Sequence, residues 1–216
     1  MPVRSTKGEA VPFAKPVANV PRGSLRALRT AAADCRQCPL WRNATQTVFG
    51  RGAAHATVML IGEQPGNEED LQGRPFVGPA GRLLDRVLEE AGLERDALYL
   101  TNTVKHFKFE RRGKARLHKR ANAGEQAACR PWLAAEWSRI RPRWVVALGA
   151  MAAQTVFGNA FRLTQERGKA FALDGKVTAM ATWHPAAVLR APSGRRERLY
   201  RELLGDLMVV SAALRR

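Results

Sequence analysis

The sequence predicts an α/β fold, namely a three-layer α/β/α domain around a central four-stranded parallel sheet. Four short apolar runs each stop at a glycine or at polar residues, and helix-length amphipathic segments separate them. This alternation is typical of a parallel sheet that is covered by helices on both faces. A chain of 216 residues can bury the core that such a domain needs. Residues 24–216 are therefore expected to form one domain.

The chain before this domain differs in composition. Residues 1–23 are rich in proline, basic and small residues and lack hydrophobic periodicity, which predicts a flexible basic arm. Ser24 can then cap a short helix that runs through Asp34. This helix leads directly into a Cys-x-x-Cys motif, formed by Cys35 and Cys38.

The four apolar runs are the predicted strands. They occupy residues 58–61, 98–100, 144–148 and 177–182. Runs that are apolar throughout suit parallel strands, which are buried on both faces. Helices are predicted at residues 82–91, 124–140 and 195–214, with a further short helix that ends at Phe157. Pro79 suits the first turn of helix 82–91, and Gly92 suits its end.

Residues that do not suit a packed core follow all four predicted strands. They are the turn at 62–66, Asn102, Gly149 and His184. Ligands of open α/β sheets bind at the edge where the carboxyl ends of the strands meet, so we expect a single site there. A second glycine-rich turn around Phe76 and a basic loop ending at His118 suit the binding of a flat polar ring beside a phosphodiester backbone.

The charge balance points to an anionic partner. Lys and Arg number 36 against 19 Asp and Glu, which gives a net charge of +17. This favours nucleic acid before a membrane, although a solvated basic surface would also explain it. The basic residues gather at 105–120 and 190–201, and the first cluster overlaps the expected site. Because there is no apolar stretch of roughly 18 residues and no secretory h-region, we expect a cytoplasmic protein.

The glycines of the two turns have two interpretations. Gly62, Gly66, Gly78 and Gly81 would let backbone N–H groups approach a base or phosphate, and a helix beginning near Pro79 would point its positive end at an anion. Structural tight turns use glycine just as often.

Four motifs, taken in their order and spacing, resemble the uracil-DNA glycosylase superfamily. They are Gly-Glu-Gln-Pro-Gly at 62–66, Val-Lys-His at 104–106, a basic loop ending in histidine at 114–118, and His-Pro-Ala-Ala-Val-Leu-Arg at 184–190. The resemblance spans roughly residues 34–190 and is to the iron–sulfur branch, close to family 4, and within it to the UdgX type. It implies a uracil-DNA glycosylase-like fold and the excision of uracil from DNA, with free uracil as the product. Single-stranded DNA is the expected substrate because no base pair must be opened, and we expect a monomer.

The resemblance assigns base recognition to three side chains. Phe76 would stack on uracil, although a phenylalanine is more often a core residue. Asn102 carries a donor and an acceptor that match O4 and N3–H, although an asparagine at a strand end is often only a turn former. His184 would donate to O2, where negative charge grows as the glycosidic bond breaks, unless it only completes a Trp-His-Pro turn. Further substrate contacts are expected from Gly62, Gly66 and Arg116.

Gln64 stands where many relatives carry an acidic residue that positions water, and an amide cannot take up a proton at neutral pH. In the UdgX type a histidine at the end of the basic loop captures the sugar instead, and His118 occupies that place. A neutral imidazole can attack C1′ and leave the protein covalently attached to the DNA. Glu63 would hold its tautomer, and Gln64 would make backbone or base contacts. His118 could also be a loop residue that only meets phosphates.

The match departs from the usual pattern in two places. The loop reads Lys-Ala-Arg-Leu-His where the UdgX type usually has Lys-Arg-Arg-Ile-His, so Ala115 removes one charge. Ala186 and Ala187 stand where serines are usual, which removes candidate hydrogen bonds to the sugar-phosphate.

Three cysteines and one histidine form the predicted metal site. Cys35 and Cys38 form a Cys-x-x-Cys motif, which in a reducing compartment indicates metal binding or redox chemistry before a disulfide. Cys129 is the third thiol. Iron–sulfur relatives carry a cysteine at the position of His106, so the resemblance implies a Cys₃His site for a [4Fe-4S] cluster. The same donors suit zinc, and spacing does not choose between the two metals.

Two other functions stay open. An ordinary turnover glycosylase would use water as the final nucleophile and leave His118 incidental. A metal-stabilised, non-catalytic nucleic-acid-binding protein would use Phe76 and the basic loops to hold strands.

Overall fold

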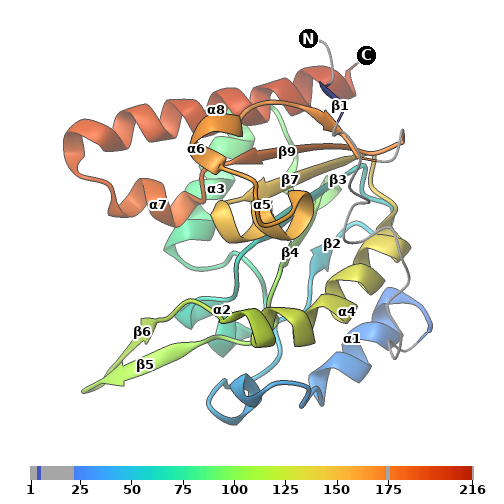
Figure 1. Cartoon of the computed structure of the whole chain (residues 1–216), viewed down its shortest axis with the longest axis vertical. Coiled ribbons are helices and arrows are strands. Elements are labelled where there is room, and N and C mark those ends of the chain that lie inside the picture. Colours follow the sequence, from blue (N-terminus) through green and yellow to red (C-terminus); the bar gives the residue numbers. More distant parts are fainter. Residues whose placement is uncertain (1–3, 6–21, 174–175, 216) are drawn as a thin grey trace.

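A computed structural model describes residues 4–5, 22–173 and 176–215. The centre of the molecule is a mostly parallel β-sheet (Figure 1). Within this described part, the strand order of the sheet is β1-β8-β9-β7-β3-β4-β2. Its four central strands are mutually parallel, as the alternating apolar runs predicted. They are β9 (Thr178–Thr182), β7 (Trp144–Leu148), β3 (Val58–Gly62) and β4 (Tyr99–Asn102).

Short strands border this parallel core. β8 (Phe171–Ala172) runs antiparallel to β9, and β2 (Arg51–Gly52) runs antiparallel to β4. β1 (Arg4–Ser5) pairs with β8. The rest of the segment expected to be a flexible arm, residues 1–3 and 6–21, lies outside the described residues. Edge strands this short offer little unpaired backbone to another chain.

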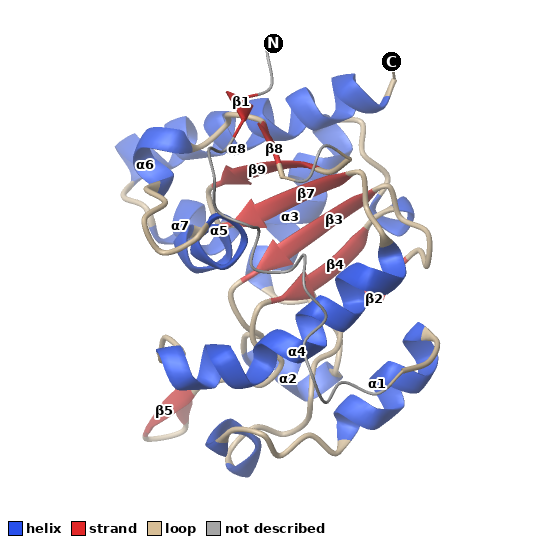
Figure 2. Ribbon diagram, turned by 45° about the vertical axis from the view of Figure 1, so that its right-hand side comes forward, coloured by secondary structure: helices blue, strands red, loops and turns tan. Residues whose placement is uncertain are grey.

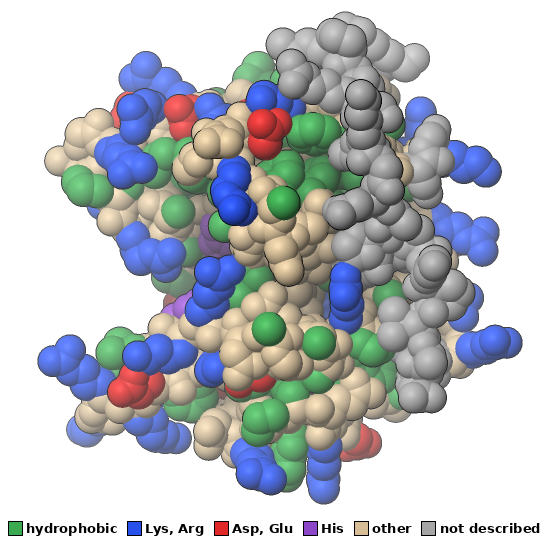
Figure 3. Space-filling view, in the orientation of Figure 1, with side chains coloured by type: hydrophobic (Ala, Val, Ile, Leu, Met, Phe, Trp, Pro, Cys, Tyr) green, Lys and Arg blue, Asp and Glu red, His purple; other side chains and the backbone are tan. Residues whose placement is uncertain are grey.

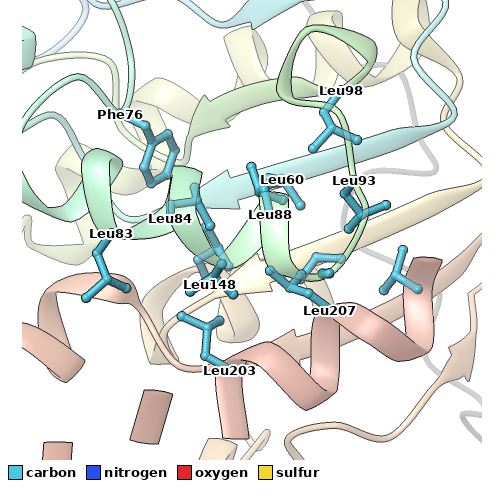
Figure 4. Packing of buried hydrophobic residues seen from close by; sticks show 14 of the residues in the cluster. Leu60, Phe76, Leu83, Leu84, Leu88, Leu93, Leu98, Leu148, Leu203 and Leu207 are labelled. Carbon is cyan, nitrogen blue, oxygen red and sulfur yellow. The ribbon is translucent and has the colours of Figure 1, made fainter. Parts of the chain in front are cut away.

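Alternate residues of each central strand face opposite helical layers, and Figure 2 shows helices on both faces of the sheet. Val58 and Leu60 pack towards α3 (Pro79–Glu90), α7 (Pro185–Arg190) and α8 (Ser193–Leu214). Figure 4 shows part of this cluster, in which Leu60 and Leu148 of the sheet meet leucines of α3 and α8.

Met59 and Ile61 pack towards the opposite layer. That layer contains α4 (Ala123–Ile140), α5 (Ala150–Phe157) and α6 (Leu163–Glu166). Successive side chains of β3 therefore pack into two separate hydrophobic cores, one on each face of the sheet, as a three-layer domain requires.

Outside the sheet, α1 (Leu25–Ala33) packs on α4 through Leu28 and Trp132. Ser24 caps α1 as predicted, because its Oγ accepts a hydrogen bond of 3.2 Å from the N–H of Ala27. Several elements escaped prediction. They are the short strands β1, β2 and β8, the helices α6 and α7, and η1 (Pro39–Arg42), α2 (Asn67–Gln72), η2 (Arg95–Ala97), β5 (Phe109–Arg112) and β6 (Ala115–His118). Among the described residues, no helix combines the length and apolar character needed to cross a membrane.

The predicted basic loop is in fact a β-hairpin. β5 and β6 pair antiparallel, with Arg112 opposite Ala115, which leaves a two-residue turn at Gly113 and Lys114. Gly113 has φ 58°, the left-handed conformation that such tight hairpins require. The hairpin projects from the body of the molecule at the lower left of Figure 1, with His118 as the last residue of β6.

Lys105 lies in the interior and not on the basic surface, which corrects its expected place among the phosphate contacts. Its side chain and that of Glu136 in α4 are both 0% exposed and form an ion pair of 2.6 Å. Lys105 Nζ also donates to the carbonyl of Asn102 and to the hydroxyl of Thr101, each at 2.7 Å. The buried charges thereby fasten the end of β4 to α4.

The Lys105→Met substitution is expected to lower the free energy of unfolding by about 3–5 kcal/mol, because it leaves Glu136 charged and unpaired in the interior. Urea titration measures this loss. Lys119→Met is the matched control, since its ion pair with Glu110 joins side chains that are 54% and 61% exposed. That control should cost less than about 1 kcal/mol. Equal losses in both variants would contradict the assignment of Lys105 as a buried anchor.

Candidate active site

A cleft of about 650 Å³ opens at the carboxyl edge of the parallel strands. Figure 3 shows a notch between the α7 side of the molecule and the β5–β6 hairpin, with histidine atoms inside it. Eight of the residues expected at the site line this cleft. They are Glu63, Gln64, Gly66, Phe76, Asn102, His118, Gly149 and His184. The cleft also receives Trp183, Leu189 and Arg190, which come from the end of β9 and from α7.

Gly62 allows two of these side chains to meet. A Cβ atom at this position would lie 2.3 Å from Asn102 Oδ1 and 2.7 Å from Phe76 Cζ. Asn102 is 2% exposed and Phe76 is 5% exposed, so both form the deep end of the cleft. Phe76 also belongs to the core cluster of Figure 4. The core and the stacking interpretations of this residue are therefore compatible.

One carboxylate that the sequence reading missed organises both glycine turns. Glu69 Oε2 accepts a hydrogen bond of 3.1 Å from the N–H of Gly66 in the first turn. Its Oε1 accepts from Val77 and Gly78 in the second turn, at 3.0 and 2.7 Å. The spacing of Gly66 and Glu69 is that of a capping box at the start of α2, a signal present in the sequence. The two turns therefore form one wall of the cleft.

His184 caps α7, and this bond sets its tautomer. Its Nδ1 accepts a hydrogen bond of 3.1 Å from the N–H of Ala186, so the proton of the neutral ring sits on Nε2. Burial, with further effects of the charges of Arg190 and His118, lowers the pKa of His184 to about 4. At pH 7 the ring is thus a neutral donor. It lies 6.2 Å from the Phe76 ring, measured between centroids, with 29° between the planes.

His118 and Glu63 face each other across the mouth of the cleft. Glu63 Oε1 lies 4.0 Å from His118 Nε2, and both side chains keep part of their surface in solvent. Burial and the charge of Arg190 lower the pKa of His118, while Glu63 acts in the opposite direction. The imidazole is therefore uncharged at neutral pH, as a nucleophile must be.

Gln64 holds the hairpin that carries His118. Its Nε2 donates to the carbonyl of Lys108 at 3.1 Å and to that of Lys119 at 3.0 Å, one on each side of the hairpin. Its Oε1 is buried and has no hydrogen-bond partner among the described residues. Gln64 therefore anchors the hairpin with its N–H groups.

Arg116 is placed differently from the expectation that it contacts substrate. It does not line the cleft. Its NH1 pairs with Asp70 Oδ2 at 2.7 Å, and its Nε donates to Asn67 Oδ1 at 2.6 Å. The guanidinium also lies over the rings of Phe107 and Phe109. These contacts attach the hairpin to α2, so Arg116 acts on the site through the position of β6.

The four predicted metal ligands are all buried, but no group of three or more His, Cys, Asp or Glu side chains in the described part of the chain is arranged to hold an ion. Cys35 Sγ accepts a hydrogen bond of 3.1 Å from the indole of Trp132. A hydrogen bond from Cys129 and the nearby imidazole of His106 lower the pKa of Cys38 to about 5 against the opposing effect of burial.

The donor set nevertheless fits a metal in its chemistry. His106 Nε2 is bonded to the hydroxyl of Thr47 at 2.9 Å, whereas its Nδ1 is buried and has no partner among the described residues. A thiol that ionises readily and a free imidazole nitrogen are the groups that a metal or cluster binds.

Comparison with known proteins agrees with this geometry. Residues 49–208 match the family profile described as the Uracil DNA glycosylase superfamily. The chain belongs to this superfamily. It is 35% identical over 181 residues to the type-4 uracil-DNA glycosylase of Sulfurisphaera tokodaii, which covers 80% of this chain and 79% of that one. It is 37% identical to the type-4 enzymes of Archaeoglobus fulgidus (76% of this chain, 82% of that one) and Thermotoga maritima (78% and 84%).

Arg190→Ala is expected to raise the pKa of both cleft histidines of this superfamily member, because the arginine charge disfavours their protonated forms. Burial is the larger cause for each, so both values should stay below the ordinary 6.5. Titration of the ring nitrogens by NMR measures the shift, with Arg195→Ala as a control on α8. If Arg190→Ala leaves both titrations unchanged, the charge of Arg190 does not reach these rings.

Proposed function

We propose that the protein is a uracil-DNA glycosylase of the UdgX type, which excises uracil and captures the sugar on His118. One observation carries the proposal. The cleft brings a neutral histidine and a facing carboxylate, Glu63, together with a base-sized pocket lined by Phe76 and Asn102. The relatedness to type-4 uracil-DNA glycosylases supports the substrate, DNA that contains uracil.

In this proposal the pocket reads a base that has left the stack. Phe76 stacks on its face, and the amide of Asn102 pairs with N3–H and O4. His184 presents its Nε2–H to O2, where charge develops as the bond to C1′ breaks. A fixed donor of this kind typically lowers the barrier by about 3 kcal/mol. The neutral state of His184 suits it to donate without adding a charge to the pocket.

The capture step balances without water. A ring nitrogen of His118 attacks C1′, the electron pair of the glycosidic bond leaves with uracil N1, and Glu63 takes up the imidazole proton. Gln64, which cannot accept a proton, contributes the position of the hairpin. This is why the proposal favours a covalent product over the ordinary turnover enzyme, in which an acid beside Glu63 would activate water.

DNA is held by exposed basic side chains around the cleft. The tip of the hairpin presents Arg111 and Arg112 at the end of β5 and Lys114 in the turn, and the start of α8 presents Arg195 and Arg198. A single strand is the preferred form because unstacking is then the only cost of reaching the pocket. The other alternative is a non-catalytic nucleic-acid-binding protein. Binding alone does not require a histidine and a carboxylate that face each other, so this alternative leaves the His118–Glu63 pair unexplained.

A uracil-containing single strand mixed with the protein is expected to give a band on a denaturing gel that stays shifted after boiling in detergent, and a thymine strand none. His118→Ala should abolish the shifted band, because among the described histidines His118 is the one that lies within 4.0 Å of the Glu63 carboxylate. His55→Ala, an exposed histidine outside the cleft, is the matched control and should keep it. Alkali cleavage of uracil DNA without a shifted band would identify the turnover enzyme. If both the shifted band and the alkali cleavage are absent, the protein is a binder without catalytic activity.

We further propose that Cys35, Cys38, His106 and Cys129 hold a [4Fe-4S] cluster. The support is the buried donor set and the unpartnered Nδ1 of His106. Such a group would tie α1 and η1 to α4 and to the segment after Asn102, a structural role.

Anaerobically purified protein is then expected to be coloured and to contain iron and acid-labile sulfide. His106→Ala should lower the iron content, whereas His55→Ala should not. Zinc in place of iron would favour the alternative metal, and protein without either metal would refute the site.

A further inference from the structure

Phe76 has a backbone conformation that its residue type rarely adopts. Its φ is 56°, and among the described non-glycine residues only Arg141 shares a positive φ. A bulky side chain in this region is strained, and such strain persists only where the surroundings enforce it. Phe76 is also the residue proposed to stack on uracil. What enforces its conformation therefore decides where the stacking ring lies.

Arg95 holds the peptide that follows Phe76. Its NH2 donates to the carbonyl of Phe76 at 2.9 Å and to that of Pro75 at 3.3 Å. Its NH1 pairs with the carboxylate of Asp85 in α3. The guanidinium thus spans two consecutive carbonyls and an acid, a pattern that only the fork of an arginine can serve. Arg95 belongs to η2, outside the cleft.

The next groups along the chain are fixed from the other side. Glu69 accepts from the N–H groups of Val77 and Gly78. Gly81 approaches so closely that a Cβ atom there would lie 2.0 Å from the carbonyl oxygen of Phe76. The carbonyl of Phe76 is therefore bound by Arg95, and the amides that follow are bound by Glu69.

On the side where Arg95 binds the carbonyls of Pro75 and Phe76, the loop is not closely packed. A cavity of about 410 Å³ lies there and is lined by Phe76, Asp85, Arg95 and Leu100. Phe76 lines both this cavity and the active-site cleft. On the side of the cavity, the hydrogen bonds of Arg95 hold the carbonyls of the loop, while the ring of Phe76 packs in the core cluster.

We propose that Arg95, oriented by Asp85, is a positioning residue for base recognition: it holds Phe76 in the left-handed conformation that places its ring against the base. The inference rests on the proposed uracil excision and extends it to a pair of residues that lie outside the active-site cleft. Without Arg95 the loop relaxes into the cavity, and the ring withdraws from the base. Binding of the uracil ring then weakens, while binding of the DNA backbone does not.

The test compares Arg95→Ala, Arg95→Lys and Asp85→Asn with wild type in single-turnover excision of uracil from a single strand. Half-inhibition by free uracil reports on the ring pocket, and the Kd for a uracil-free strand reports on backbone contacts. Arg95→Ala should need roughly tenfold more free uracil, the effect of one lost charge-assisted hydrogen bond, with an unchanged Kd. Arg95→Lys and Asp85→Asn should lie between. Arg74→Ala, an exposed arginine on the same cavity that is bonded to Gln72, should match wild type.

A double-mutant cycle with Phe76→Ala separates positioning from general stability. Arg95→Ala should slow excision in wild type and change nothing further once Phe76 is alanine. Additive losses, or an inhibition by uracil that equals that of wild type, would overturn the inference. A wild-type protein that neither excises uracil nor is inhibited by it would instead overturn the proposed function.

Discussion

The site depends on a charged pair in the interior. Glu136 of α4 accepts hydrogen bonds from the N–H of Gly50, the hydroxyls of Tyr99 and Thr101, and Lys105 Nζ. Lys105 in turn holds the carbonyl of Asn102. A carboxylate and an ammonium without solvent are tolerable only when every lone pair and proton has a partner, and here they do. The end of β4, which carries the proposed base-reading amide, is fixed as a result.

Buried carboxylates that accept several hydrogen bonds also hold the loops of the cleft. Glu69 joins the two glycine turns, and Asp70, 0% exposed, accepts from Arg116 of the hairpin and from the N–H of Thr45. The chain has only 19 acidic residues for its 36 basic ones. Glu69 and Asp70 are buried beneath the loops around the cleft, where they accept hydrogen bonds from backbone N–H groups and, in the case of Asp70, from Arg116.

The sequence predicted what depends on local pattern. The apolar runs predicted the parallel strands because burial on both faces leaves a continuous apolar signature, and the strand ends predicted the cleft because parallel topology brings them together. Lys105 and Arg116 were assigned to a basic surface because a sequence displays charge and not depth. Their true partners, Glu136 and Asp70, lie 31 and 46 residues away along the chain. Such pairs become visible only once the helices are packed.

The β5–β6 hairpin and the contacts of Arg95 and Glu69 with the Phe76 loop could not be predicted from the sequence for a related reason. Gly113 is a turn signal, but exposed strands of charged residues lack the apolar alternation that predicts a strand. Arg95 looks like any surface arginine until its bonds to the Phe76 loop are known. The chemistry of the cleft therefore rests on residues of ordinary type. Glu63, His118 and His184 could be singled out by their motifs, whereas the groups that hold the surrounding loops in place are ordinary residues in particular positions. In the proposed mechanism, a chain with the same motifs but without Glu69, Arg95 or Gln64 would keep the side chains assigned to the reaction and lose the hydrogen bonds that align their loops.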